Sequence, residues 1–390
     1  MKASRLHLSI LFFITFAAFG GIGNFLSLYY LDRGMSVQQV GLLVSVPAAM
    51  SLLAAPLWAG IADWFHLHKY ILPIVMLLSL PVALVFPKFE NFGQLMLGIL
   101  FFSGCYSTFL PLLDNTVLVN LGTQKTHYGH IRLWGSIGVG LMALVTGWLV
   151  EQFNLKIIFA IYSFFITLAA VSALLVPKPP KIKIESYWKR AGQFLRDSRW
   201  KKFLFACLLS GLSHLFLAYY LFIFIKGLGA KDTFIGFAIM LSAATNIIIY
   251  FIMPRLLQHW SVLRLMLLSN ILMIVRMLIA IFIHTPEMSI IVVLLDGPTW
   301  ATMWSAGVHY ASDIAPHGLG ASAQALYNGI FTGLGGIISA SLGGVIYAHF
   351  GAPVLFSISA VFALLCVLML FSLDHEHESF NRTKIDTAYK

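Results

Sequence analysis

The chain has 390 residues, of which 59% are hydrophobic and only 10% are charged, and its net charge is +10. Soluble proteins carry about 25% charged residues, so this composition excludes a soluble globular protein and favours a chain whose main solvent is the lipid bilayer. The positive charge does not indicate a nucleic-acid partner, because most lysines and arginines fall in loops on one side of the expected spans.

Apolar stretches of roughly twenty residues follow one another along the chain, and short polar turns separate most of them. They lie at 8–31, 37–62, 70–87, 91–119, 130–151, 155–176, 203–226, 234–256, 263–284, 288–311, 320–348 and 352–373. The pattern predicts an all-α integral membrane protein with twelve transmembrane helices. Its partners are then the lipid bilayer and a small-molecule substrate.

The longest break in the pattern is the basic, proline-containing segment 177–202. It separates an N-terminal six-helix bundle at 1–176 from a C-terminal six-helix bundle at 203–373, and residues 374–390 form a tail. Residues 186–200 are amphipathic, which predicts a helix on the cytoplasmic membrane surface, with a plain solvated linker as the alternative.

The two halves resemble each other weakly in sequence. Gly147 and Phe153 close the fifth stretch, and Gly344 and Phe350 close the eleventh, 197 residues later. Repeats of this kind build pseudo-symmetric transporters with a site at the midplane between the halves.

The distribution of basic residues sets the orientation. With the N-terminus in the cytoplasm, 18 of the 25 lysines and arginines are cytoplasmic, 5 lie on the opposite face and 2 lie inside spans. This asymmetry predicts a multi-pass plasma-membrane protein, of the bacterial inner membrane, with both termini in the cytoplasm. The first stretch continues into further spans, so we expect an uncleaved helix rather than a signal peptide.

An acid and an arginine face each other across a short loop in the first half. Asp114 lies in the fourth stretch and Arg132 in the fifth, in otherwise apolar surroundings. An ionised side chain at mid-bilayer costs at least about 2.5–3.5 kcal/mol unless a partner or water offsets it. We interpret the pair as a substrate site in which Arg132 grips a carboxylate or hydroxyls and Trp134 offers an aromatic platform. The alternative is a salt bridge that only orients the loop.

A second acid–arginine pair lies in the other half. Arg276 is in the ninth stretch and Asp296 in the tenth, again joined by a short turn. A buried acid beside an arginine can gain and lose a proton as the conformation changes, as proton coupling requires. We assign coupling to Asp296 and Arg276, with His309 as a further titratable group. A static bridge is the alternative.

Several weaker candidates complete the predicted site. His214 in the seventh stretch, Asn24 in the first and Tyr327 in the eleventh are assigned to substrate binding. Each has an ordinary alternative, since a lone histidine in an apolar helix is often a packing residue and tyrosine often lies at a membrane interface.

The sequence contains no P-loop, no G-x-S-x-G and no H-E-x-x-H. Neither an ATP-driven pump nor a membrane protease is therefore supported, and we expect no enzyme activity. The three cysteines have no pairing or metal spacing, so no metal and no cofactor are expected. Without an ATP motif, the energy must come from an ion gradient or from the solute itself, and we expect a proton gradient.

The segment from Pro56 to Tyr70, PLWAGIADWFHLHKY, resembles the motif between the second and third helices of the major facilitator superfamily, especially its lactose permease version. In that family the aspartate caps helices of the neighbouring half when the outward face is closed. The resemblance implies a gating role for Asp63 together with Lys69. Trp64 and His66 depart from the family pattern.

The step from Asp114 to Arg132 is similar to the acid-to-arginine step that binds galactoside in lactose permease. The surrounding Tyr128-Gly-x-x-Arg132-x-Trp134 resembles the 3-phenylpropionate permease and nucleoside-symporter-like branch. Val139 stands where lactose permease has its sugar-stacking tryptophan, so the resemblance does not imply galactoside specificity.

The 20-residue spacing from Arg276 to Asp296 matches the spacing between the ninth-span arginine and the tenth-span histidine of lactose permease. Thr299 stands at the position of the permease's proton-carrying glutamate. Either Asp296 takes the proton-carrying role, or proton coupling is lost. We expect a monomeric secondary active transporter that symports protons with a sugar, nucleoside or aromatic acid by alternating access. Efflux antiport of a drug, secreted metabolite or siderophore is the alternative, and a polytopic membrane enzyme or receptor is the alternative from another class.

Overall fold

The computed structural model describes residues 4–65, 67, 70–121, 128–176, 197–315 and 319–388, and all regular elements within these ranges are helices. Its first part contains α1 (Arg5–Ile22), α2 (Phe25–Asp32), α3 (Val37–Trp64), α4 (Ile71–Val85), the turn η1 (Phe86–Lys88), α5 (Phe92–Tyr106), α6 (Phe109–Leu121), α7 (Tyr128–Gln152) and α8 (Ile157–Leu174). Capping boxes begin α3 and α5, at Ser36 and Asn91, because each cap side chain accepts from the backbone three residues on.

The second part contains α10 (Ser198–Gly227), α11 (Asp232–His259), α12 (Val262–Ile281), η3 (Pro286–Met288), α13 (Ser289–Leu294), η4 (Gly297–Ala301), α14 (Thr302–Asp313), α15 (Gly320–Asn328), η5 (Gly329–Leu334) and α16 (Gly335–Ala388). The Asp197 side chain accepts from Arg199 N at 2.8 Å and caps α10. This helix therefore begins before residue 203. The predicted surface helix at 186–200 lies almost wholly outside the described residues.

Ten segments of the described chain are long and apolar enough to cross a membrane. Nine coincide with the first nine predicted stretches. The tenth, Ser322–Asp374, spans the last two stretches and is broken at Gly351, whose φ of 80° is left-handed. The predicted stretch 288–311 is divided into α13, η4 and α14. The all-helical membrane fold is thus confirmed, and the count of twelve rests on these two interrupted segments.

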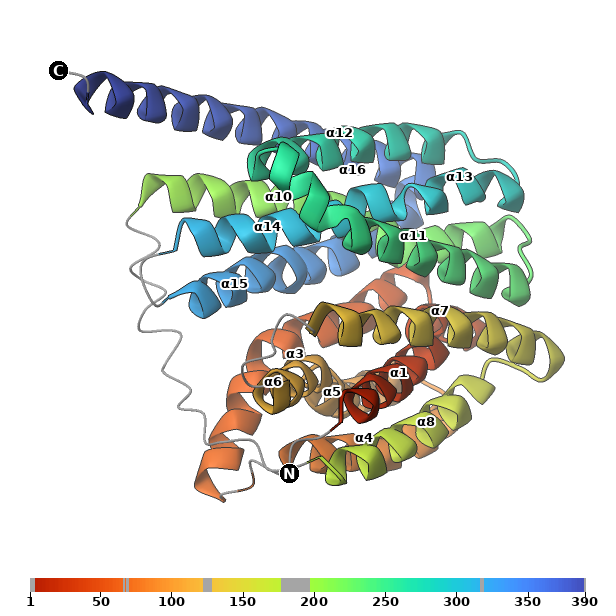
Figure 1. Ribbon diagram of the computed structural model, residues 1–390. Helices are drawn as coiled ribbons and strands as arrows, with labels where there is room; N and C mark the ends of the chain where they lie inside the picture. Colours follow the sequence, from red (N-terminus) through yellow and green to blue (C-terminus); the bar gives the residue numbers. More distant parts are fainter. Residues whose placement is uncertain are drawn as a thin grey trace.

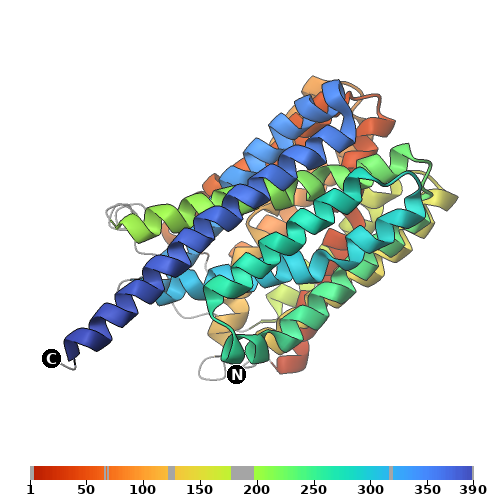
Figure 2. The same cartoon turned by 90° about the horizontal axis from the view of Figure 1, so that it is seen from above.

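The helices gather in two groups in chain order (Figure 1), with α1–α8 in red to yellow and α10–α16 in green to blue. Seen from above, they run side by side, and the end of α16 extends beyond the others (Figure 2). Two helix pairs join the groups closely: α7 packs against α11, and α3 packs against α16.

Glycines allow both of these crossings. A Cβ on Gly147 would collide with the Asp232 carbonyl at the start of α11, and one on Gly344 would lie 2.9 Å from the Val37 carbonyl at the start of α3. The two glycines of the weak sequence repeat therefore occupy matching positions, where backbones of the two groups touch. Hydrogen bonds join the same end, since the Gln38 amide contacts the His349 ring at 3.2 Å and Thr233 Oγ1 donates to Glu151 at 2.5 Å. This end of the bundle is closed.

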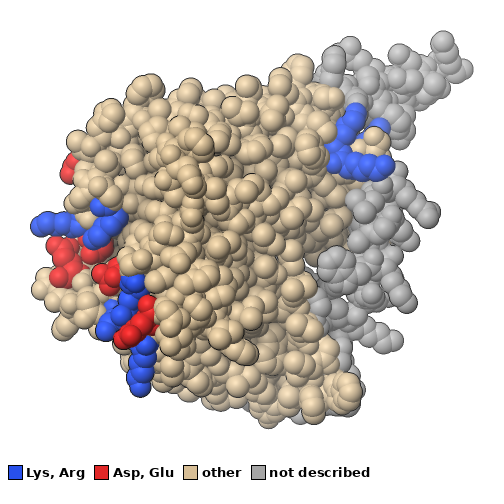
Figure 3. All heavy atoms as spheres, turned by 180° about the vertical axis from the view of Figure 1, so that it is seen from behind, with Lys and Arg blue, Asp and Glu red and all other residues tan. Residues whose placement is uncertain are grey.

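Charged side chains on one face of the molecule gather at two opposite margins, with a wide uncharged band between them (Figure 3). Such a band matches the surface that a bilayer covers. Many large hydrophobic side chains are accordingly exposed, among them Phe101, Leu168 and Phe251. Phe153 and Phe350, the other repeated pair, are each 67% exposed.

Candidate functional site

The first acid–base pair forms between α6 and α7. Arg132 Nη1 lies 3.2 Å from Asp114 Oδ1 and 3.4 Å from Oδ2, so one nitrogen contacts both oxygens. The Tyr128 hydroxyl donates to Asp114 Oδ1 at 2.7 Å, and Arg132 Nη1 donates to the Tyr128 hydroxyl at 3.4 Å. Tyr128 and Arg132 are one helical turn apart, so both side chains reach the acid on α6.

This pair is accessible. The Arg132 and Asp114 side chains are 32% and 28% exposed, although they lie inside a membrane span. Within the described residues, the guanidinium donates to Asp114 and Tyr128 through Nη1, so its other nitrogens are available to hold a bound carboxylate or hydroxyl. Trp134 lies on a different side of α7 and is 46% exposed. Its ring packs edge-on against Phe13 of α1, with the two ring centroids 6.5 Å apart.

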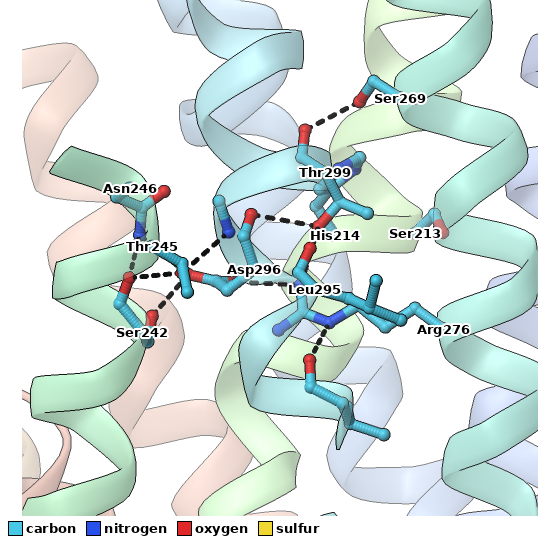
Figure 4. Close-up of polar contacts among 12 residues, drawn as sticks. Ser213, His214, Ser242, Thr245, Asn246, Ser269, Arg276, Leu295, Asp296 and Thr299 are labelled. Carbon is cyan, nitrogen blue, oxygen red and sulfur yellow. Dashed lines mark hydrogen bonds and ion pairs between the residues drawn. The ribbon is translucent and has the colours of Figure 1, made fainter. Parts of the chain in front are cut away.

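The second pair is buried more deeply. Arg276 Nη1 lies 2.8 Å from Asp296 Oδ1, and the arginine side chain is only 5% exposed (Figure 4). Arg276 also donates through Nε to the Val292 carbonyl at 2.7 Å and through Nη1 to Thr299 Oγ1 at 2.9 Å. A buried charge is tolerated when its hydrogen-bonding groups are satisfied in this way.

The other carboxylate oxygen of Asp296 is held by α11. Ser242 Oγ donates to Asp296 Oδ2 at 2.5 Å and Asn246 Nδ2 donates to it at 2.9 Å (Figure 4). Ser242 and Asn246 are one turn apart, so both reach the same oxygen. The carboxylate therefore connects α11 and α12 to the start of η4.

The backbone breaks where Asp296 is placed. Pro298 lacks an N–H, and the helix widens into the π-helical turn η4 directly after Asp296. Gly297 allows this turn to approach α11, because a Cβ there would collide with the Thr245 carbonyl, and Gly297 N donates to Thr245 Oγ1 at 3.1 Å. Thr299 Oγ1 donates back to Leu295 O at 2.7 Å. Side-chain hydrogen bonds thus add to the backbone bonds around the acid, since Thr299 N also donates to Leu295 O at 3.1 Å.

Tyr250 of α11 lies within electrostatic range of one member of each pair. It interacts with Arg132 in one group of helices and with Asp296 in the other. No sequence pattern singled out Tyr250. Ser242, Thr245 and Asn246 were also missed, although three polar residues within five positions of an apolar span could have marked them.

The remaining predicted residues lie in different places. Asn24 lines a cavity of about 240 Å³ bounded mainly by apolar side chains of both groups, including Leu43 and Phe222. Tyr327 is fully buried and donates to the Met303 carbonyl at 3.3 Å, and His309 is exposed on α14. For the predicted gating residues, the structure describes the backbone of Asp63 within α3, and Lys69 lies outside the described residues.

His214 lies beside the second pair. It is 3% exposed, and its Nδ1 is 2.9 Å from the Ser210 carbonyl. Its ring centroid is 6.1 Å from that of Trp300 and 5.9 Å from that of Phe331. The Trp300 and Trp304 rings are nearly parallel, with centroids 6.0 Å apart, and form an aromatic cluster that was not predicted.

Residues 5–358 match the model of the MFS_1 like family. The chain belongs to the MFS_1 like family. The predicted membership of the major facilitator superfamily is therefore confirmed, and the protein is a multi-pass membrane transporter of that type.

Known relatives agree along almost the whole chain. The maltose permease of Geobacillus stearothermophilus is 26% identical over 368 residues, covering 93% of each chain. The probable 3-phenylpropionic acid transporter of Escherichia coli is 27% identical over 371 residues, covering 92% of this chain and 94% of that one. Crystal structures of the nucleoside transporter NupG, as a mutant and as NupG itself, give TM-scores of 0.80 and 0.75 at 17% and 18% identity. They cover 95% of this chain and 99% and 98% of those chains, and at this identity they show the shared fold.

Proposed function

We propose that this transporter carries a small polar organic solute together with protons, in symport, and that Asp296 is the proton-carrying group. The observation that carries the proposal is the Asp296 carboxylate itself, which Arg276 of α12 and Ser242 and Asn246 of α11 hold at a π-helical break. Its charge state decides how firmly three elements are joined.

Protonation of Asp296 would change each of these contacts. A neutral carboxylic acid has one oxygen that donates rather than accepts, and it no longer compensates the Arg276 charge. Because Ser242 and Asn246 both donate to Oδ2, a proton on this oxygen breaks part of the α11 contact. Proton binding is thereby linked to the packing of α11, which crosses α7 at the closed end.

Asp114 and Arg132 are proposed to bind the solute. Arg132 is positively charged, partly exposed and only partly occupied by Asp114. A planar guanidinium suits a carboxylate or neighbouring hydroxyls. The names of the relatives, a maltose permease and a probable 3-phenylpropionic acid transporter, include both kinds of solute.

The energy source and membrane location belong to the same proposal. The proton gradient supplies the driving force without an organic cofactor or metal. The positive-inside asymmetry of 18 against 5 basic residues supports a bacterial inner-membrane location with both termini in the cytoplasm. The proposed working unit is a monomer.

The proposal is tested in two steps. Thermal-shift measurements on the purified protein with maltose, 3-phenylpropionate and a nucleoside identify the solute, since a ligand of the folded state raises Tm. That solute is then followed in proteoliposomes, both as accumulation driven by a pH gradient and as exchange at equal pH. Asp296→Asn should abolish accumulation and retain exchange.

Asp313→Asn is the matched control, because Asp313 is an exposed acid at the other end of the same helical segment. It should behave like the parent protein in both assays. Accumulation by Asp296→Asn at the parent level would contradict a proton-carrying role for Asp296.

A further inference from the structure

The cavity of about 240 Å³ lies between the two groups of helices, where the first span is interrupted. α1 ends at Ile22 and α2 begins at Phe25, so Gly23 and Asn24 break this span, and both residues line the cavity. Irregular backbone inside a bilayer is tolerated where it borders a cavity. Another part of the wall comes from α10 of the second group. The cavity is therefore complete only while the two groups are in contact.

The cavity lies between the closed end of the bundle and the Asp114–Arg132 pair. Leu43 of α3 and Phe222 of α10 line it, and each is within about two helical turns of the closed end of its helix. Tyr106 lines it from the fourth span, and Asp114 follows on the same span, roughly 12 Å further along at 1.5 Å per residue. A solute that reaches both places would extend along this span.

Aromatic rings of both groups border the cavity. Phe102 and Tyr106 of α5 stack with their centroids 5.2 Å apart, and Tyr219 and Phe222 belong to α10. An apolar cavity of about 150 Å³ is sufficient to bind benzene, whereas sites that enclose a whole ligand measure about 300–1,000 Å³. At about 240 Å³ the cavity has room for one substituted ring. Its size and walls indicate a subsite for the ring of a larger solute.

The polar side chains around the cavity lack partners. They are Asn24, Ser27, Tyr106 and Tyr219, and none of them makes a side-chain hydrogen bond with the described residues. Unsatisfied polar groups inside a membrane protein are costly, so water or a ligand must use them. The Asn24 amide can donate and accept, and so can the two tyrosine hydroxyls. These groups favour a ring with hydrogen-bonding atoms on its edge over a plain hydrocarbon.

We propose that this cavity is the ring-binding subsite of the transporter, and that its solute carries an aromatic ring with hydrogen-bonding groups on the ring edge. The inference rests on the proposed function and names the class of solute. The ring occupies the space between α5 and α10, with its polar edge toward Asn24. The carboxylate or hydroxyls at the other end of the solute extend toward Arg132. A hydroxylated aromatic acid and a nucleoside both have this form, whereas maltose has no aromatic ring.

The same placement predicts how the solute is released. The ring contacts α5 in one group and α10 in the other, so separation of the groups at the closed end removes part of the wall. Opening of this end therefore weakens the hold on the ring at the moment that the exit is formed.

A panel of four compounds tests the class of solute. Thermal shifts of the purified transporter are compared for maltose, 3-phenylpropionate, 3-(4-hydroxyphenyl)propionate and uridine. The last two compounds have a ring with a polar edge, and one of them should raise Tm the most. The inference is overturned if neither of the two raises Tm or if maltose exceeds both.

Variants of the cavity test the place where the ring binds. Ala218 is exposed and lines the cavity, so Ala218→Phe fills it. The Kd of the more stabilising polar ring compound, measured by calorimetric titration, should rise about 10- to 150-fold, because burial of the ring is lost. Asn24→Ala should raise it about 2- to 12-fold through the loss of a hydrogen bond.

Ala160→Phe is the matched control, because Ala160 is an exposed residue of α8 that does not line the cavity. It should bind the compound like the parent protein. Parent-like Kd values for Ala218→Phe and Asn24→Ala would place the ring elsewhere and overturn the inference. Should Ala218→Phe not fold, Asn24→Ala decides alone.

The failure of this inference is distinguishable from the failure of the proposed function. Accumulation of maltose under a pH gradient, lost in Asp296→Asn, would leave symport standing and exclude the ring-binding subsite. Binding of a polar ring compound that Ala218→Phe abolishes, without accumulation under a pH gradient, would leave the subsite standing and exclude symport.

Discussion

Arg132 and Arg276 are both guanidinium groups within membrane spans, but their surroundings differ. Arg276 is 5% exposed and has an acid, a hydroxyl and a carbonyl as partners. Arg132 is 32% exposed and contacts its acid through one nitrogen. Arg276 is therefore part of the packed interior, whereas Arg132 keeps N–H donors that a solute can use. Substitutions of the two arginines should have different consequences.

Replacing Arg132 by lysine should weaken solute binding with little loss of stability. An ammonium group keeps the charge near Asp114 but loses the planar fork. Loss of a charge-assisted hydrogen bond of about 1.5–3 kcal/mol corresponds to a roughly 10- to 150-fold increase in Kd. Calorimetric titration with the transported solute measures it. Arg264→Lys, at a half-exposed position on α12, is the control, and an unchanged Kd for Arg132→Lys would refute its binding role.

Substitutions of the Arg276–Asp296 pair should not be additive in stability. Removing one partner leaves a buried charge and costs about 3–5 kcal/mol, whereas removing both leaves no charge to compensate. We expect Arg276→Gln/Asp296→Asn to melt above Asp296→Asn alone. Thermal unfolding of the single and double variants in the same detergent checks this, and simple addition of the two losses would show that the pair is not coupled.

At the scale of elements, hydropathy predicted nine spans close to their observed positions, because the length of apolar sequence that crosses a bilayer is narrowly fixed. It did not predict where helices break. The stretch 288–311 looked continuous, but Asp296 is followed by Gly297 and Pro298, and the turn they form depends on hydrogen bonds from α11.

For the candidate site, the sequence predicted the two charge pairs but not the residues of the neighbouring helix that surround Asp296. Opposite charges joined by a short loop were sufficient to pair Asp114 with Arg132 and Arg276 with Asp296, and both pairs form. The contribution of α11 could not be predicted, because no local pattern states which neighbouring helix Asp296 faces. The same tertiary dependence explains why Tyr327, selected for binding, is packed into the interior.

The closed end of the bundle should be sensitive to glycine substitution. A Cβ on Gly236 of α11 would collide with the Ala143 carbonyl of α7. Alanine normally stabilises a helix relative to glycine by about 1 kcal/mol. A destabilising effect of Gly236→Ala would therefore come from the lost contact between α7 and α11. We expect Gly236→Ala to separate α7 from α11 and to favour conformations in which this end is open.

A cross-link measures this separation. Gln38 and His349 are in hydrogen-bonding contact across the closed end, and Gln38→Cys/His349→Cys should form a disulfide when the end is closed. The native cysteines are buried and should not interfere. Gly236→Ala should lower the cross-linking yield, whereas Gly60→Ala, where a Cβ meets nothing within 4 Å, should not. Equal yields would show that the Gly236 crossing does not hold the end closed.

At the scale of the whole molecule, charged side chains on one face lie at two opposite margins (Figure 3), and two acid–arginine pairs lie in the interior of the described residues. The interior pairs lie in different groups of helices, one between α6 and α7 and the other between α12 and the start of η4. Under the proposed function, solute binding at Arg132 on α7 and protonation of Asp296 beside α11 would both act on the packing between α7 and α11.

The orientation predicts where reporters are active. Alkaline phosphatase, which folds only outside the cytoplasm, should be active when fused after Asn154, in the turn between α7 and α8. It should be inactive when fused within the basic segment 177–202 or at the C-terminus. The control is a cytoplasmic reporter at the same positions, which should give the reverse pattern. Activity at the C-terminus would mean an odd number of spans.

Proton movement during transport tests the central claim most directly. Purified protein is reconstituted with a pH-sensitive dye inside the vesicles, and the solute identified by thermal shift is added outside without an imposed gradient. Symport predicts acidification of the interior that follows solute entry and is absent in Asp296→Asn. Solute entry with no change in internal pH, or with alkalinisation, would contradict proton symport.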